Sequence, residues 1–249
     1  MKQTGLLLLF LALTAGTFAQ DTTDTKKKKK DWSQVNLSNR PKDHLMFQFG
    51  LLNWSQAPDS IPTKGLARTF NFAFSFDFPF KTDPRFSVGM GVGVGSDHML
   101  FDKGANRDLI INNSNGVQWR RNTGIDSTIR YKGQKLHTAY LEAPVEIRFM
   151  SKPETPNKSL KFALGMKIGT MVTAVDKTKF DSDAAGNRQY NTKVKDRKNF
   201  SSLRLAATAR VAMGNFGLFA QYQLNDFIKE GQGPSQIRPF SVGLTVSGL

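Results

Sequence analysis

Beyond residue 44, apolar residues alternate with small or polar residues in eight separate segments of the chain. In the segment 69–78, Phe occupies every even position from 70 and the odd positions hold small or polar residues. Successive side chains of a β-strand point to opposite faces, so this segment predicts a strand with one aromatic face and one small or polar face. The same pattern predicts seven further strands, at 45–51, 86–95, 139–149, 161–168, 203–213, 216–224 and 240–247.

The predicted strands and their connections have lengths typical of a membrane barrel. The strands have roughly ten residues, and a tilted strand needs about 9–11 residues to cross a bilayer. The connections alternate between long (about 53–66, 97–134, 174–199 and 225–236) and short (81–85, 151–159 and 214–215). Outer-membrane barrels have short periplasmic turns and long external loops. We therefore predict an all-β fold, an eight-stranded antiparallel transmembrane β-barrel of up-and-down topology, over residues 44–249.

A soluble lipocalin-like barrel is the alternative that the alternation leaves open, with the Phe side chains inside around a ligand. The chain has 20 Phe but only 39% hydrophobic residues, a composition that does not separate the two barrels. The order of residues favours the membrane barrel. The face opposite Phe is rich in Gly and Ala, which suits a crowded interior, and its charged residues carry both signs, as if paired.

The N-terminus predicts export. Lys2 precedes an uncharged apolar run over 6–15, and residues 17–19 form a small-x-small exit. We predict a cleaved signal peptide over 1–19, followed by a flexible Lys-rich periplasmic tail over 20–43 and a location in the cell outer membrane of a Gram-negative bacterium. The five lysines at 26–30 fit a solvated segment, or attraction to an anionic leaflet or cell-wall polymer.

Charge and cysteine content narrow the partners. The absence of Cys excludes a disulfide framework, a thiolate metal site, a cysteine nucleophile and a lipoprotein anchor. A formal charge of +15 fits either nucleic acid or an anionic membrane surface. Because the predicted export signal argues against nucleic acid, the expected partners are outer-membrane lipid, including lipopolysaccharide, and envelope proteins.

The segment Ala139–Phe149, with the sequence AYLEAPVEIRF, resembles the YLEIP-type strand of the PorT-like outer-membrane β-barrel proteins of Bacteroidetes. The signal peptide, the Gly-rich strand ending at Gly95 and the Gly-containing strand over 162–169 fit the same family. The resemblance covers about residues 44–249 and implies a barrel in the outer membrane. The member that names the family belongs to a secretion apparatus, so an accessory role in a protein secretion machine is one alternative function.

Charged residues on the predicted inner face form the main candidate site. They are Asp77, Glu142, Glu146, Arg148, Lys161, Lys167, Arg204 and Arg210. The interior of an eight-stranded barrel is just wide enough for side chains, and an unpaired charge there is costly. We therefore predict an ionic plug that closes the lumen, with a proton path, gate or binding site as the alternative. Cations beside the two Glu would keep both ionised, which disfavours acid–base catalysis.

Histidine and tryptophan supply the remaining candidates for chemistry. His44, His98 and His137 are predicted at strand ends, as rim residues. Asp97-His98 beside Ser96 suggests a hydrolase, but successive side chains diverge on a strand and cannot form a triad. We therefore predict no enzyme, with no catalytic, metal or cofactor residues. Trp54 and Trp119 are predicted as interface or loop aromatics.

The two longest predicted loops are basic, with six basic against three acidic residues in 102–134 and seven against four in 175–199. Either they are simply solvated, or they hold phosphates of surface lipid through Arg107, Arg120, Arg121, Lys193, Lys195, Arg197 and Lys198. The function we predict is a structural or interaction role in the cell envelope. An outer-membrane enzyme acting on lipid and a small-solute channel stand as alternatives beside the secretion role.

Overall fold

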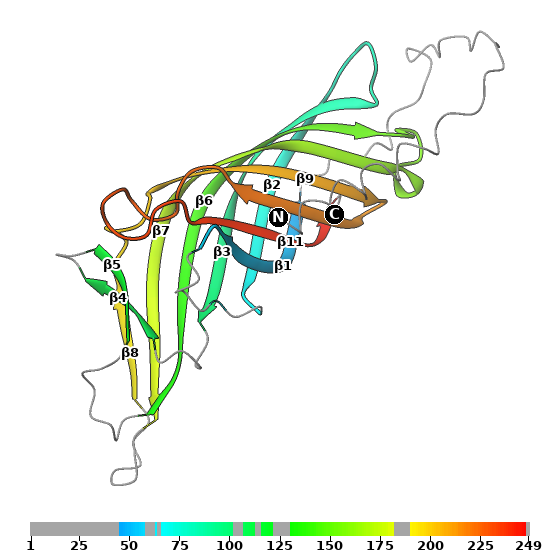
Figure 1. The fold of residues 1–249 in the computed structure, drawn as a ribbon. Coiled ribbons are helices and arrows are strands. Elements are labelled where there is room, and N and C mark those ends of the chain that lie inside the picture. Colours follow the sequence, from blue (N-terminus) through cyan, green and yellow to red (C-terminus); the bar gives the residue numbers. More distant parts are fainter. Residues whose placement is uncertain are drawn as a thin grey trace, which may run out of the picture. The chain divides into compact units, whose positions relative to one another are not determined.

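Eight long antiparallel strands form a closed barrel in the computed structural model, which describes residues 45–57, 63, 66–101, 107–112, 116–121, 130–181 and 190–247. They are β1 (Leu45–Ser55), β2 (Arg68–Pro79), β3 (Phe86–Phe101), β6 (Arg130–Met150), β7 (Leu160–Asp181), β9 (Leu203–Met213), β10 (Phe216–Gln223) and β11 (Arg238–Ser247). Their order is β6-β3-β2-β1-β11-β10-β9-β7, and a further pairing of β6 with β7 closes the ring (Figure 1). The predicted fold class is confirmed. The predicted signal peptide, the tail and His44 lie outside the described residues.

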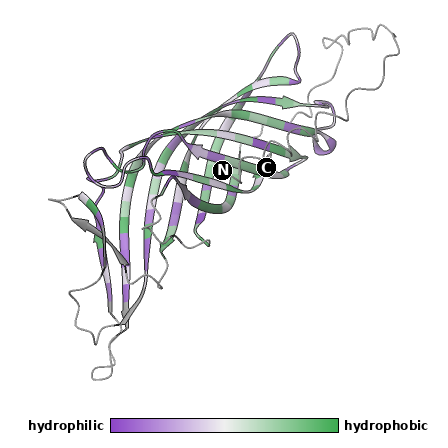
Figure 2. Cartoon of the chain, in the orientation of Figure 1, coloured by the Kyte–Doolittle hydropathy of each residue, from purple (hydrophilic) through white to green (hydrophobic). Residues whose placement is uncertain are grey.

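The alternation of residues places apolar and polar side chains on opposite faces of the barrel wall, and Figure 2 shows the two kinds alternating along the strands. Outward-facing Leu164 and Phe216 are 70% and 72% exposed, whereas inward-facing Lys167 is 2% exposed. Monomeric soluble proteins rarely expose so extensive an apolar surface, whereas a barrel in lipid requires one. The lipocalin-like alternative, with Phe inside, is therefore wrong.

The apolar outer surface, which we call the lipid-facing band, has a clear edge on the side of the long connections. On β3 the outward residues are apolar from Phe86 to Val94 and then change to Ser96 and His98. The register places Arg68 of β2, His98 of β3 and His137 of β6 in one row across the three strands. On these three strands, this row marks the edge of the band. Separately, the described residues include no helix that is both long and apolar enough to cross a membrane.

The predicted long loops are in large part strand, which corrects the sequence interpretation. β6 and β7 continue well beyond the band, and β8 (Tyr190–Lys195) pairs with the end of β7 (Figure 1). A separate hairpin joins β4 (Arg107–Asn112) to β5 (Gly116–Arg121). The alternation is lost there because both faces of the extended sheet carry polar residues, as at Asp176, Lys177 and Thr178 of β7.

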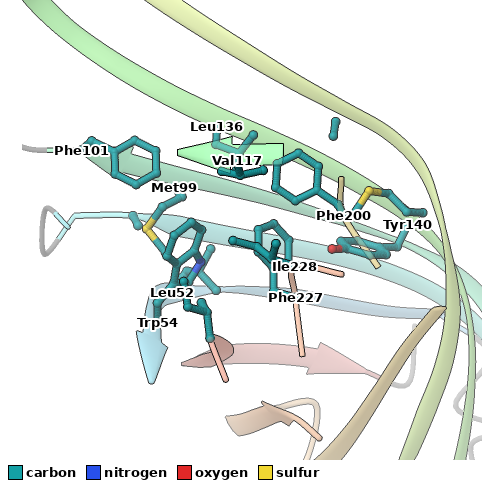
Figure 3. Packing of buried hydrophobic residues seen from close by; sticks show 14 residues of the cluster. Leu52, Trp54, Met99, Phe101, Val117, Leu136, Tyr140, Phe200, Phe227 and Ile228 are labelled. Atoms are coloured by element: carbon teal, nitrogen blue, oxygen red, sulfur yellow. The ribbon is translucent and has the colours of Figure 1, made fainter. Parts of the chain in front are cut away.

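Inside the barrel, an apolar core occupies the end beyond the band (Figure 3). Trp54 is 6% exposed, with its ring 5.6 Å from that of Phe101 and 5.3 Å from that of Phe227. The other members are Leu52, Ala67, Met99, Val117, Leu136, Tyr140, Met171, Ala174, Phe200, Ile228 and Ile237. Outside lipid the wall meets water, so its apolar side chains turn inward as in a soluble protein. The prediction of Trp54 as an interface or loop residue is therefore wrong, and the side chain of Trp119 lies outside the described residues.

We expect a charge on the lipid-facing band to impair folding into a bilayer. Leu164→Arg places a cation near the middle of the band on β7 and should lower the free energy of unfolding by about 2–4 kcal/mol. Urea unfolding from lipid vesicles measures this value. Lys179→Arg, beyond the band on the same strand, is the matched control and should change little. Equal stabilities for both variants would contradict the placement of the band.

Candidate functional site

Inward-facing charges at the level of the band form two ion-pair groups. The first joins β2, β6 and β9 around Glu146, which is 2% exposed. Arg210 Nη2 and Arg148 Nε lie 2.5 Å and 3.1 Å from Glu146 Oε2. Arg148 also reaches Asp77, with Nη1 3.6 Å from Oδ1, and donates to Ser75 Oγ at 3.0 Å. One buried carboxylate thus binds two guanidinium groups, and one of these extends to a second carboxylate.

The second group joins β3, β6, β7 and β9 around Arg204, which is 1% exposed. Its Nη1 lies 3.1 Å from Glu142 Oε1 and its Nη2 lies 2.9 Å from Asp97 Oδ2. The guanidinium carbon also stands 4.4 Å from the centroid of the Tyr140 ring, a cation–π arrangement. Lys167 Nζ completes the group, 3.4 Å from Glu142 Oε2.

The two groups contain seven of the eight charged residues expected inside, together with Asp97, which the sequence analysis did not assign to the interior. The sequence alone does not assign Asp97 to the interior, because Asp97 stands where the alternation ends and a loop is predicted. Odd-numbered residues of β3 already faced inward from Ser87 to Gly95, and extending that parity would have identified it. The eighth residue, Lys161, is buried beside Asp77 and Arg148 around a small void.

Glycines of β3 and β7 provide the room for these long side chains. A Cβ on Gly89 would collide with the guanidinium of Arg148, and one on Gly95 would come within 2.9 Å of Glu142 Oε1. A Cβ on Gly169 would stand 3.0 Å from Glu142 Cγ. The Gly-rich pattern of the third strand is therefore part of the ionic site.

At the level of the band, the inward-facing residues on the opposite side of the barrel are mainly polar and neutral. Inward-facing Gln, Ser and Thr line β1, β9, β10 and β11, namely Gln48, Thr208, Gln221, Gln223, Ser241, Thr245 and Ser247. Lys167 links the two sides, donating to Gln221 Oε1 at 2.9 Å and to Gln48 Oε1 at 3.2 Å. Voids of about 20 Å³ and 10 Å³ remain between the inward-facing side chains that are described. Each is about large enough for a single water molecule.

A larger hollow of about 1050 Å³ lies against the lipid-facing band. Its lining is mainly apolar and includes Phe49, Phe162, Leu164, Leu218 and Leu244. Most of these side chains face lipid, so acyl chains would cover much of the hollow, and its lining also includes Arg148 and Arg210 of the first ion-pair group.

At the edge of the band, Ser96 hydrogen-bonds two histidines. Its Oγ lies 3.2 Å from His98 Nε2 and 3.0 Å from His137 Nε2, and the two rings stack with centroids 4.4 Å apart. His137 is not at a strand start as predicted, because β6 already begins at Arg130. Residues 96 and 98 share a face, whereas Asp97 points inward to Arg204 and so cannot orient either imidazole as in a Ser-His-Asp triad.

The predicted lipid-contact residues are only partly placed. Lys193, Lys195 and Lys198 are exposed, and Arg197 Nη1 donates to the carbonyl of Met171 at 3.1 Å. The side chains of Arg107, Arg120 and Arg121, on β4 and β5, lie outside what the structure describes. Among the described side chains, no three or more His, Asp or Glu residues group closely enough to hold a metal ion.

The histidine pair should make stability depend on pH. Partial burial lowers the pKa of His98 and of His137; for His98, the neighbouring His137 and Lys135 lower it further against an opposing effect of Asp97. Between these lowered pKa values and the unfolded value of about 6.5, the unfolded chain binds more protons. The free energy of unfolding should therefore fall as the pH drops below about 6.5 and stay level above it.

The free energy of unfolding can be measured at pH 7.5 and at pH 5. Between these two values it should fall less for the double variant His98→Gln/His137→Gln than for the unsubstituted chain. An equal fall would show that other groups cause the pH dependence.

Comparison with known proteins relates this barrel to others. No curated protein matches the chain. Among solved structures, it is similar to Ail, the attachment invasion locus protein of Yersinia pestis, with 13% identity over 82% of this chain and 95% of Ail and a TM-score of 0.37. A second Ail structure, in complex with the heparin analogue sucrose octasulfate, has 10% identity, the same coverage and a TM-score of 0.34. The family model described as "outer membrane protein beta-barrel domain" matches residues 18–248, so the chain belongs to the family of outer-membrane β-barrel domains.

Proposed function

We propose that the chain is a closed outer-membrane barrel with a structural or interaction role in the cell envelope, and that the paired charges inside it act as an ionic plug. Two clusters of buried side chains inside the barrel support this proposal. Glu142, Glu146 and their partners fill the level of the band, and the apolar core around Trp54 fills the end beyond it. Desolvated charges that are already paired offer no free site for a passing ion.

Several finer properties belong to the same proposal. Residues 1–19 are a cleaved signal peptide, residues 20–43 form a flexible periplasmic tail, and the barrel is an outer-membrane protein of a Gram-negative cell. Its partners are outer-membrane lipid, including lipopolysaccharide, and envelope proteins. Catalysis is not part of the proposed role: Ser96 and its two histidines have no carboxylate on their face among the described residues, since Asp97 points to the interior.

The PorT-like resemblance is retained as a proposal on family membership. The strand that carries it, Ala139–Phe149, directs Tyr140, Glu142 and Glu146 to the interior, where they meet Arg204 and Arg210. These residues therefore specify the inside of the barrel and not a surface for a secretion partner. An accessory role in secretion remains the second candidate, and a deletion strain that fails to export many proteins would support it over a purely structural role.

Conductance across a planar bilayer tests the closed lumen. The refolded full chain should give no sustained current steps above the baseline, with a general porin as the positive control. Slower migration after boiling, in a detergent gel, verifies in the same preparation that the barrel had folded. Sustained steps from a folded sample would overturn the closed barrel and favour the small-solute channel.

A further inference from the structure

Five exposed lysines gather on one face of the sheet that β6, β7 and β8 form beyond the band. The register sets Lys135 opposite Lys177, and Lys177 opposite Lys193, so that one row crosses three strands. Lys179 and Lys195 belong to the rows on either side and share the face. We call these residues the lysine face: Lys135, Lys177, Lys179, Lys193 and Lys195.

The charges of the lysine face are not compensated among the described residues. Directly opposed side chains of an antiparallel pair lie about 4.5–5.5 Å apart at Cβ, where like charges are destabilising. The described neighbours on this face include Leu100, Gly133, His137, Val175 and Asn191, none of which is acidic. Asp176 points to the other face, where its Oδ2 accepts hydrogen bonds from Gln134 and Thr178. Repulsion built into three paired strands favours an anionic ligand that relieves it.

The position of the lysine face narrows the class of that ligand. The face continues the outer surface of the barrel, whose apolar part on β7 extends to Val172, 56% exposed. Lys195 pairs with Val175 and Lys193 with Lys177, three and five residues beyond Val172. At about 3.3 Å per residue and a tilt of about 40°, they stand about 8 Å and 13 Å above the band.

Phospholipid head groups reach only about 5–8 Å beyond the hydrocarbon core. The upper lysines therefore stand above a phospholipid surface, at a height that a phosphorylated saccharide head group would occupy. Lysine ammonium groups bind phosphate as point charges, so a row of them suits several phosphates on one large head group.

We propose that the lysine face binds the phosphorylated saccharide head group of an outer-leaflet glycolipid. This inference rests on the proposed outer-membrane location. It adds Lys135, Lys177 and Lys179 to the two lysines of β8 that the sequence indicated. The barrel would thereby hold glycolipid against one side of its wall, over the extensions of β6 and β7.

The test measures affinity for lipopolysaccharide in detergent micelles, using the full chain and the variant Lys135→Gln/Lys177→Gln/Lys193→Gln. The matched control Lys81→Gln/Lys152→Gln/Lys158→Gln removes three exposed lysines from the short turns at the opposite end. At about fivefold per lysine, the face variant should bind about 100-fold more weakly, and the control should bind as the unsubstituted chain does. Equal affinities of the face and control variants would overturn the proposal.

Further ligands separate the sources of phosphate. Dephosphorylated lipopolysaccharide should bind the unsubstituted chain as weakly as intact lipopolysaccharide binds the face variant. Phosphatidylglycerol vesicles should bind the face variant and the control variant equally well. Loss of phosphatidylglycerol binding in the face variant alone would assign the face to a phospholipid surface. Binding of soluble polyphosphate as tightly as lipopolysaccharide would assign it to a soluble polyanion. If the chain did not fold as a membrane barrel, the unsubstituted chain would show no heat-dependent gel shift. That outcome is separate from the binding results.

Discussion

A charge inside an eight-stranded barrel has almost no water around it, and the interior of this protein is organised by that constraint. Each buried carboxylate of the two groups binds a cation from a neighbouring or distant strand, as Glu146 binds Arg210 across 64 residues of sequence. Removing one partner would leave the other charge buried and unpaired, at a cost of about 3–5 kcal/mol. The pairs therefore tie together the strands that close the ring.

Glycine residues make room for the ionic groups, and the position of the bilayer determines where the polarity of the barrel wall changes. Gly89 and Gly95 keep β3 thin where Arg148 and Glu142 cross the lumen, so the wall and its contents are adapted to each other. Past the band, the lipid that favours apolar side chains outside is replaced by water. The polarity of the wall changes there: Leu52 and Trp54 turn inward on β1, and lysines occupy the outer surface of β7 and β8.

Strict alternation made the band predictable from sequence, because each strand there meets lipid on one side and a polar interior on the other. Parity alone assigned Glu142, Glu146 and Arg204 to the interior, although which charges pair depends on register, which alternation does not encode. The strand extensions were missed because residues such as Asp176, Lys177 and Thr178 are polar on both faces. The sequence does not predict the buried position of Trp54. Within the band apolar residues face outward, and nothing in the sequence marks the point beyond which they face the interior.

The coupling between Glu142 and Arg204 tests most directly whether paired charges organise the interior. A double-mutant cycle with Glu142→Gln, Arg204→Met and the combined variant, followed by urea unfolding from vesicles, measures their interaction free energy. The account predicts that each single variant is destabilised, that the double variant loses less than the sum of the two, and that the coupling is at least about 1 kcal/mol. Additive losses would show that the two side chains act independently and would contradict the central role given to the ionic layer.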